Sequence, residues 1–306
     1  MEFYSNYCQK KNKSQNYPSL EQRVKTVREL LEEAEYVVIG AGSGLSSAAG
    51  LDFGGERFEK YMGEFGSRYG YHDMYSGDFY NYQTREEFWA FEAKTILVNR
   101  YEVPGLKLYH KLFDLIKDKN HFVITTNVES QFAKSGFDSN RIFATQGDYS
   151  KLQCGGACHD TLYDNEKLVK EMVAKTRDCA IPTELIPKCP ICHREMKVNL
   201  RSDGYFVEDK SWHEACSRYE SFISSINKAP VVYLEFGVGY NTPGIIRYPF
   251  ERFTYANPNA HLIRFNRDYP EGITENKDKT IGFTEDMNMV LAMLFEPTKG
   301  EQENEL

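Results

Sequence analysis

Four short apolar runs are spread along the chain, and each is rich in β-branched or aromatic residues. They are YVVIG (36–40), HFVITTN (121–127), VVYLEFGVG (231–239) and AHLIRFN (260–266). Near-continuous apolar runs of this length are typical of strands buried on both faces of a parallel sheet. The pattern therefore predicts four buried strands.

Longer amphipathic stretches lie between these runs. In residues 19–34, apolar residues recur every three or four positions, and Ser19 with Gln22 three residues later is a plausible N-terminal cap. Helices are also predicted over 84–98, 105–119 and 284–296. Strands that alternate with helices indicate an α/β fold with a doubly wound parallel sheet.

Composition and charge exclude several classes of function. The 306 residues are 41% hydrophobic and 27% charged, as in ordinary globular proteins. With a net charge of −8 and no basic run interleaved with aromatics, no nucleic-acid partner is expected. No apolar stretch approaches the ~18 residues of a membrane span, and the N-terminus lacks a cleavage signal, so we expect no membrane association and a cytoplasmic location.

Four of the seven cysteines form two close pairs. Cys154 and Cys158 are spaced C-x3-C, and Cys189 and Cys192 are spaced C-x2-C. Two such pairs can meet at one tetrahedral zinc ion, and four thiolates close its shell, so the prediction is a structural zinc site. The adjoining histidines could compete as ligands: His159 and His193. Four unrelated buried thiols remain the alternative.

The stretch VVIGAGSGLSSAAG joins the first strand to a helix start through a glycine turn. Gly40 and Gly42 would let a pyrophosphate approach the backbone, and a helix N-terminus would add N–H donors. Because Leu45 stands where a third glycine would complete the dinucleotide-binding pattern, a purely structural strand–helix turn is also possible.

Taken in order, these pieces resemble the sirtuins. The residues that carry the resemblance are GAG (40–42), Asp52–Phe53, ITTNVE (124–129), ATQGDY (144–149) with the cysteine pairs, FGVG (236–239) and RFNRD (264–268). Sirtuins bind NAD as co-substrate on a Rossmann-like domain and carry a small zinc module. Matched by motif, the implied cofactor-binding residues are Gly40, Ala41, Gly42, Ser43, Leu45, Asp52, Phe53, Asn127, Glu129, Gln146, Gly237, Val238, Gly239, Asn266 and Arg267.

The resemblance also implies a division of the chain. We expect a Rossmann-like NAD-binding domain interrupted by a helical, aromatic insertion and a zinc-binding module, between two flexible ends. The corresponding ranges are 19–53, 105–150 and 225–298 for the NAD-binding domain, 54–104 for the insertion, 151–215 for the zinc module, and 1–18 and 299–306 for the ends.

The departures from the sirtuin pattern are informative. Gln146 stands where sirtuins have their histidine base, Glu129 replaces an aspartate, and Gly54 replaces an arginine. This set resembles the class M, macrodomain-linked microbial sirtuins, which are protein ADP-ribosyltransferases. The resemblance implies a lipoylated carrier of the glycine-cleavage H type as acceptor. It further implies a macrodomain hydrolase and a lipoate ligase as functional partners, in a response to oxidative stress.

The glutamine changes the reaction that we expect. Glutamine donates and accepts hydrogen bonds but does not titrate usefully, and loss of a general base costs roughly 10²–10⁴-fold in rate. Deacylation should therefore be slow. Cleavage of the nicotinamide–ribose bond needs orientation and exclusion of water rather than that base. We predict that Asn127 and Gln146 are catalytic and orient the ribose, that Glu129 holds the carboxamide and that Phe53 shields the nicotinamide face.

Single residues of this set have ordinary structural explanations as well. Asn127 could simply be a turn former at a strand end, Gln146 a surface residue and Phe53 a core residue. Arg57 is the nearest cation that could replace the missing arginine.

Three other activities stay open at the level of sequence. A residual deacylase would need another base, for which His159 and Asp148 are the nearby candidates. The chain could instead sense NAD or ADP-ribose without turnover, or hydrolyse NAD with water as the acceptor.

Overall fold

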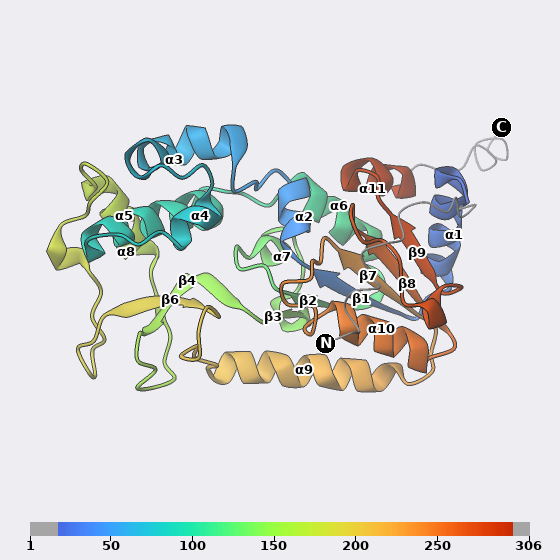
Figure 1. Cartoon of the computed structure of the whole chain (residues 1–306). Helices are drawn as coiled ribbons and strands as arrows, with labels where there is room; N and C mark the ends of the chain where they lie inside the picture. The colour runs from blue at the N-terminus through green and yellow to red at the C-terminus, as the bar shows by residue number, and fades with distance from the viewer. Residues whose placement is uncertain (1–17, 296–306) are drawn as a thin grey trace, which may run out of the picture.

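The centre of the protein is a six-stranded parallel sheet, seen in a computed structural model that describes residues 18–295 (Figure 1). The strand order is β3-β2-β1-β7-β8-β9, and all neighbours run parallel. The strands are β1 (Tyr36–Ala41), β2 (Asn120–Thr125), β3 (Ile142–Ala144), β7 (Val231–Phe236), β8 (Ala260–Phe265) and β9 (Thr280–Phe283). The order reverses between β1 and β7, and doubly wound sheets bind ligands at the carboxyl edge of such a point.

Helices cover both faces of this sheet, as Figure 1 shows. One face carries α1 (Leu20–Glu33), α6 (Lys107–Ile116) and α11 (Met287–Phe295), and the other carries α9 (Lys210–Ile226) and α10 (Arg247–Ala256). Val37 and Ile39 of β1 pack in the apolar core under α1, α6 and α11, and Val38 between them packs in the apolar core under α9 and α10. Alternate side chains thus enter opposite layers, which explains why the strand sequence is apolar throughout.

A second lobe lies beside the sheet (Figure 1). Its helices are α3 (Gly55–Tyr69), α4 (Met74–Asp78), α5 (Arg85–Ile96), the π-helix η1 (Leu97–Tyr101) and α8 (Glu166–Lys175). Its antiparallel sheet has the order β5-β4-β6, with β4 (Gly147–Cys154), β5 (Tyr163–Asp164) and β6 (Met196–Leu200). One apolar core joins Phe58 and Trp89 from the helices to Leu152 and Met196 from the sheet, so the two expected insertions form a single lobe.

The remaining elements are short. They are α2 (Ser43–Ala48), α7 (Gln131–Lys134), η2 (Ser139–Arg141), η3 (Thr183–Leu185) and η4 (Thr274–Asn276).

The α/β fold, the doubly wound sheet and all four expected strands are confirmed, and Ser19 and Gln22 form a reciprocal capping box. The predicted elements did not include β3, β9, α9 or α10. Three expected domain boundaries fall inside elements, because β4 crosses residue 150 and α9 crosses residues 215 and 225. The expected flexible ends lie almost wholly outside the described residues. No helix within 18–295 is long and apolar enough to cross a bilayer.

Candidate active site

The glycine turn after β1 lies at the carboxyl edge of the sheet and packs against the end of β7. The N–H of Gly42 donates to the carbonyl of Phe236 at 3.0 Å, and the N–H of Gly44 donates to the carbonyl of Gly237 at 3.2 Å. A Cβ on Gly44 would lie 2.7 Å from Gly237 Cα, so only glycine permits this approach. These two N–H groups are therefore bonded within the protein, and pyrophosphate binding by the turn stays a prediction.

Gly40 also serves packing. A Cβ there would lie 2.4 Å from the side chain of Ile246 and 2.6 Å from that of Phe250 in α10. Ala41 and Leu45 are fully buried in the core beneath the turn. Direct cofactor contact by these three residues stays a prediction, whereas their packing is visible.

Two adjoining cavities open beside the turn. The first, here called the Glu129 cavity, has a volume of about 360 Å³, and the second, the Gln146 cavity, has about 350 Å³. Both are lined by Ser43, Thr126, Asn127 and Val128, which follow β1 and β2 directly. The cavities therefore lie at the carboxyl edge where a doubly wound sheet binds its ligand.

Many of the predicted cofactor-binding residues line these cavities. They are Gly42, Ser43, Phe53, Asn127, Glu129, Gln146, Val238 and Gly239. Asp52 is exposed, and its side chain lines neither cavity. Segments far apart in sequence thus converge at one place, although their individual contacts with a cofactor remain predictions.

Asn127 is held at the junction of the two cavities. Its Nδ2 donates to the carbonyl of Gly42 at 3.0 Å and to the hydroxyl of Tyr109 at 3.3 Å. Its own N–H donates to Thr125 Oγ1 at 3.0 Å. The side chain is 8% exposed, so it is a fixed amide inside the site rather than a solvent-facing turn residue.

Glu129 is a buried carboxylate with several donors around it. Its Oε1 accepts from Ser46 Oγ at 2.7 Å and from the Tyr109 hydroxyl at 3.2 Å, and its Oε2 accepts from Val128 N at 3.0 Å. Burial, followed by the nearby Glu129 charge, raises the pKa of Tyr109 well above its usual range, so that hydroxyl keeps its proton. Tyr109 can therefore donate at any physiological pH.

Gln146 lines its cavity and carries a side-chain acceptor without a partner. Its backbone carbonyl accepts from Arg201 N at 3.0 Å. Its side-chain Oε1 is shielded from solvent and accepts no hydrogen bond from the described residues. Gly147 follows with a φ of 99°, and a Cβ there would lie 1.8 Å from the carbonyl oxygen of Asn199. This glycine lets the chain turn from the sheet into β4 and fixes where Gln146 points.

The other candidate bases are engaged elsewhere. Asp148 accepts from Ser130 Oγ at 2.6 Å and from Ser150 N at 2.7 Å, and pairs with Arg100 at 3.2 Å. His159 lies beside the cysteine pairs, with its Nδ1 3.1 Å from Cys158 Sγ. Within residues 18–295, no histidine lines either cavity.

Arg57 does not face the cavities as a free cation. It donates to the carbonyls of Asp52 at 3.1 Å and Val98 at 2.8 Å, and burial lowers its pKa. It therefore ties the Phe53 loop to η1, and the suggestion that it replaces the missing arginine finds no support in its contacts. Among the described residues, Arg201 is the cation that lines the Gln146 cavity.

The Asn266 loop supports the cavity wall from behind. Asn266 Nδ2 donates to the carbonyl of Val238 at 2.9 Å, and its Oδ1 accepts the N–H groups of Asp268 and Tyr269. Arg267 is exposed and pairs with Asp268 at 3.4 Å. Asn266 thus positions the loop after β7, and cofactor contact by Arg267 stays a prediction.

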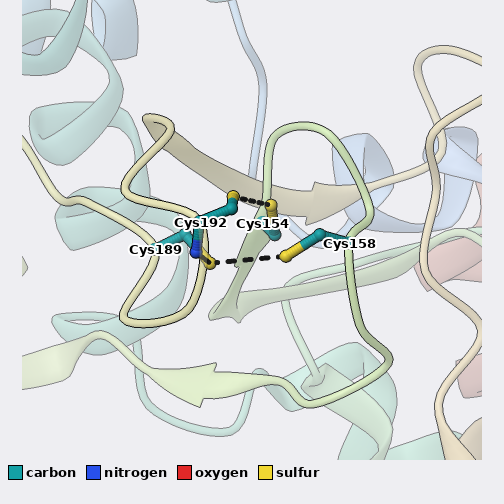
Figure 2. Close-up of side chains that lie close together, drawn as sticks. All are labelled: Cys154, Cys158, Cys189 and Cys192. Atoms are coloured by element: carbon teal, nitrogen blue, oxygen red, sulfur yellow. Dashed lines mark hydrogen bonds between the residues drawn. The ribbon is translucent and has the colours of Figure 1, made fainter.

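The two cysteine pairs meet in the second lobe (Figure 2). The sulfur atoms of Cys154, Cys158, Cys189 and Cys192 all lie within 4.8 Å of one another. The Sγ atoms of Cys154 and Cys192 are 3.5 Å apart, and those of Cys158 and Cys189 are 3.7 Å apart. Zn–S bonds of about 2.3 Å in a tetrahedron place sulfurs about 3.8 Å apart, so the cluster could hold zinc.

The backbone around this cluster favours thiolates. The N–H groups of Ile191 and Cys192 point at Cys189 Sγ, at 3.4 and 3.5 Å. His159 lies between the cluster and Tyr163, because its Nδ1 is 3.1 Å from Cys158 Sγ and its Nε2 is 2.9 Å from the Tyr163 hydroxyl. His193 is exposed and is not part of the cluster. All-cysteine ligation is therefore the arrangement that the geometry allows.

Sequence reasoning missed several residues of the site. Ser46, Tyr109, Asn99 and Arg201 come from separate elements and carry no local spacing signal. Tyr109 sits at a core position of an amphipathic helix, where an aromatic residue alone indicates packing.

The chain resembles a known protein over most of its length. No family model matches it. A protein ADP-ribosyltransferase from Staphylococcus aureus (strain Mu50 / ATCC 700699) is 33% identical over 285 residues, covering 93% of this chain and 90% of the relative. The chain belongs to the protein ADP-ribosyltransferases. A second relative, a probable bifunctional ADP-ribose hydrolase/ADP-ribosyltransferase from Fusarium oxysporum f. sp. cubense, is 28% identical; the match covers 78% of this chain and 41% of that one.

Solved sirtuin structures share the fold of this ADP-ribosyltransferase. One of them, from work on the structural basis of sirtuin substrate affinity, has a TM-score of 0.55 at 19% identity. The match covers 89% of this chain and 97% of the sirtuin chain. A complex of Sir2 with a peptide and NAD has a TM-score of 0.55 at 18% identity, covering 92% and 99%. The predicted sirtuin resemblance and transferase activity are confirmed, and the macrodomain link stays a prediction.

Proposed function

We propose that this ADP-ribosyltransferase moves ADP-ribose from NAD to a lipoylated carrier protein of the glycine-cleavage H type. In the reaction the C1′–N bond to nicotinamide breaks, a bond from C1′ to the acceptor forms, and nicotinamide leaves. The observation that carries the proposal is the pairing of Asn127 and Gln146 in one cavity that no histidine of the described residues lines.

The residues fit a nucleotide carrying a carboxamide and two hydroxyls. The unpartnered, shielded Oε1 of Gln146 can accept from a ribose hydroxyl, and the fixed amide of Asn127 lies at the same cavity. Glu129 and Phe53 line the neighbouring cavity, where a carboxamide and an aromatic ring would lie. These side chains orient the sugar and exclude water, which are the requirements for cleavage.

ADP-ribose transfer and lysine deacylation differ in whether they need a general base. An acceptor carboxylate is anionic at neutral pH and attacks C1′ without first losing a proton. Deacylation requires a base at the ribose hydroxyl, and neither Gln146 nor Asn127 titrates usefully. The sirtuin-type structure therefore supports the first half of sirtuin chemistry only.

The acceptor and the partners rest on the sequence resemblance. The fungal relative's name couples ADP-ribose hydrolysis with transfer, which supports a hydrolase acting on the same product. A macrodomain hydrolase and a lipoate ligase are the partners that we propose. The four cysteines are proposed to hold structural zinc.

Labelled NAD, incubated with the enzyme and lipoylated carrier, tests the proposal. The carrier should become labelled, while the same carrier without lipoyl groups should remain unlabelled. Rapid conversion of acetyl-lysine to lysine, or labelling of both carrier forms alike, would overturn the respective part of the proposal.

A further inference from the structure

Asn99 is a buried amide whose oxygen faces no partner. It lies in η1, is 1% exposed and lines the Glu129 cavity together with Phe53 and Glu129. Its Oδ1 is shielded from solvent and accepts no hydrogen bond from residues 18–295. Buried polar atoms without partners are rare in native proteins, and one that belongs to a residue lining a cavity at the sheet edge points to a ligand.

The orientation of the Asn99 amide follows from the hydrogen bonds that its NH2 group donates. Asn99 Nδ2 donates to the carbonyl of Thr95 at 2.8 Å and lies 3.3 Å from Met74 Sδ. Turning the amide over would bring its oxygen against the Thr95 carbonyl, and two acceptors repel. The oxygen is therefore fixed as the free end.

The π-helix holds Asn99 in this position. The N–H of Glu102 donates to the carbonyl of Leu97 at 2.9 Å, five residues earlier, and Arg57 donates to the carbonyl of Val98 at 2.8 Å. Single π-turns of this kind frequently occur at functional sites. Asn99 thus presents an acceptor on a rigid element.

Two acceptors then line one small cavity. A carboxylate offers about four lone-pair sites, and Glu129 uses three of them for Ser46, Tyr109 and Val128. One site on Glu129 and the Asn99 oxygen remain for a ligand. An NH2 group has two N–H bonds and would donate one to each acceptor, whereas a carboxylate in its place would be repelled by both.

We propose that Asn99 is a cofactor-binding residue that accepts a hydrogen bond from the nicotinamide carboxamide and so selects NAD over its nicotinic acid analogue. This assignment rests on the proposed function, because it takes the Glu129 cavity as the nicotinamide site. The same oxygen would also hold nicotinamide after the glycosidic bond has broken.

Calorimetric titration of the full chain without acceptor tests the assignment. Asn99→Leu should weaken NAD binding by about tenfold, the cost of one buried hydrogen bond. ADP-ribose, which lacks nicotinamide, should bind within about twofold of the unchanged protein. The preference for NAD over nicotinic acid adenine dinucleotide should narrow. Met74→Leu removes the sulfur beside Asn99 Nδ2 and leaves the Asn99 oxygen in place, so it is the matched control and should leave the ratio of NAD to ADP-ribose affinity unchanged.

Several outcomes separate the assignment from the proposed function. If Asn99→Leu weakened the binding of NAD and of ADP-ribose equally, or weakened neither, the role of Asn99 alone would be overturned. If Asn99→Leu melts at a lower temperature, Asn99→Ser gives the same ratio test with a side chain that is easily accommodated. Failure of the unchanged protein to bind ADP-ribose would overturn the cofactor site itself, and with it the proposed function.

Discussion

Gln146 stands where sirtuins have a histidine base, and its amide oxygen has no hydrogen-bond partner among residues 18–295. Its contribution to catalysis should therefore be a hydrogen bond to the ligand rather than a proton transfer. Gln146→Leu keeps the size of the side chain and removes that acceptor. We expect kcat/KM for ADP-ribose transfer to fall roughly tenfold, in line with about 1–1.5 kcal/mol for a hydrogen bond. Tyr248→Leu, at an exposed tyrosine of α10 outside both cavities, is the control. A loss of a thousandfold or more would mean that Gln146 has a larger role than orientation.

Burial of Glu92 in the second lobe should make the stability of the protein depend on pH. It is 6% exposed, and burial, followed by the Asp78 charge, raises its pKa from 4.5 to about 8, with Arg85 acting in the opposite direction. The folded protein therefore binds a proton that the unfolded chain releases, and the stability from this group is lost as the pH rises from about 4.5 to about 8.

Glu92→Gln should remove that dependence. Since one pKa unit corresponds to about 1.4 kcal/mol, the variant should be more stable than the unchanged protein by roughly 1 kcal/mol or more at pH 8 and by much less at pH 5. Urea unfolding at both values measures this. Equal gains at the two pH values would show that the effect is not electrostatic.

At the scale of elements, the passage from β3 to β4 depends on one glycine. Gly147 has a φ of 99°, and a Cβ would lie 1.8 Å from the carbonyl oxygen of Asn199 in the paired strand β6. Gly147→Ala should destabilise the protein by roughly 3 kcal/mol or more, because it combines a strained backbone with a clash against main chain. Gly204→Ala, where no atom lies within 4 Å, is the matched control. Thermal melts of both variants decide, and similar melting temperatures would contradict this account.

The elements that the sequence predicts are those whose burial shows in their own residues. Val37, Val38 and Ile39 are fully buried on two faces, so the strand is visible as an apolar run. By contrast, β3 has only three residues and lies at the sheet edge, and α10 contains Pro249, which hides its pattern. Helix α9 has apolar residues at helical spacing and could have been found.

The residues of the candidate site also divide into those that the sequence predicts and those that it does not. Asn127, Glu129, Gln146 and the cysteines belong to short motifs that a reader of the sequence can align. Ser46, Tyr109 and Asn99 enter through helices whose side chains meet only after packing, and Ser46 and Tyr109 are 63 residues apart. Such partners follow from tertiary structure and leave no local trace.

At the scale of the whole molecule, the cysteine cluster lies in the second lobe, beside the six-stranded sheet. Cys154 and Cys189 belong to the apolar core that also contains Trp89 and Phe91 of α5. The same lobe supplies η1, which lines the Glu129 cavity. Loss of the metal that we propose should therefore loosen both the zinc module and one wall of the site, while the six-stranded sheet keeps its own cores.

Hydrogen exchange with and without a chelator measures this effect. Exchange should accelerate in 154–200 and in α5, whereas β7 and β8 should remain protected. Cys189→Ser should copy the chelator and lose bound zinc, and Cys216→Ser, on α9 away from the cluster, should keep one zinc per chain. Melting should fall by several degrees in the first variant only. Purified protein without zinc, showing the same exchange before and after chelation, would mean that the four thiols close this lobe by packing and leave the cavity wall independent of any metal.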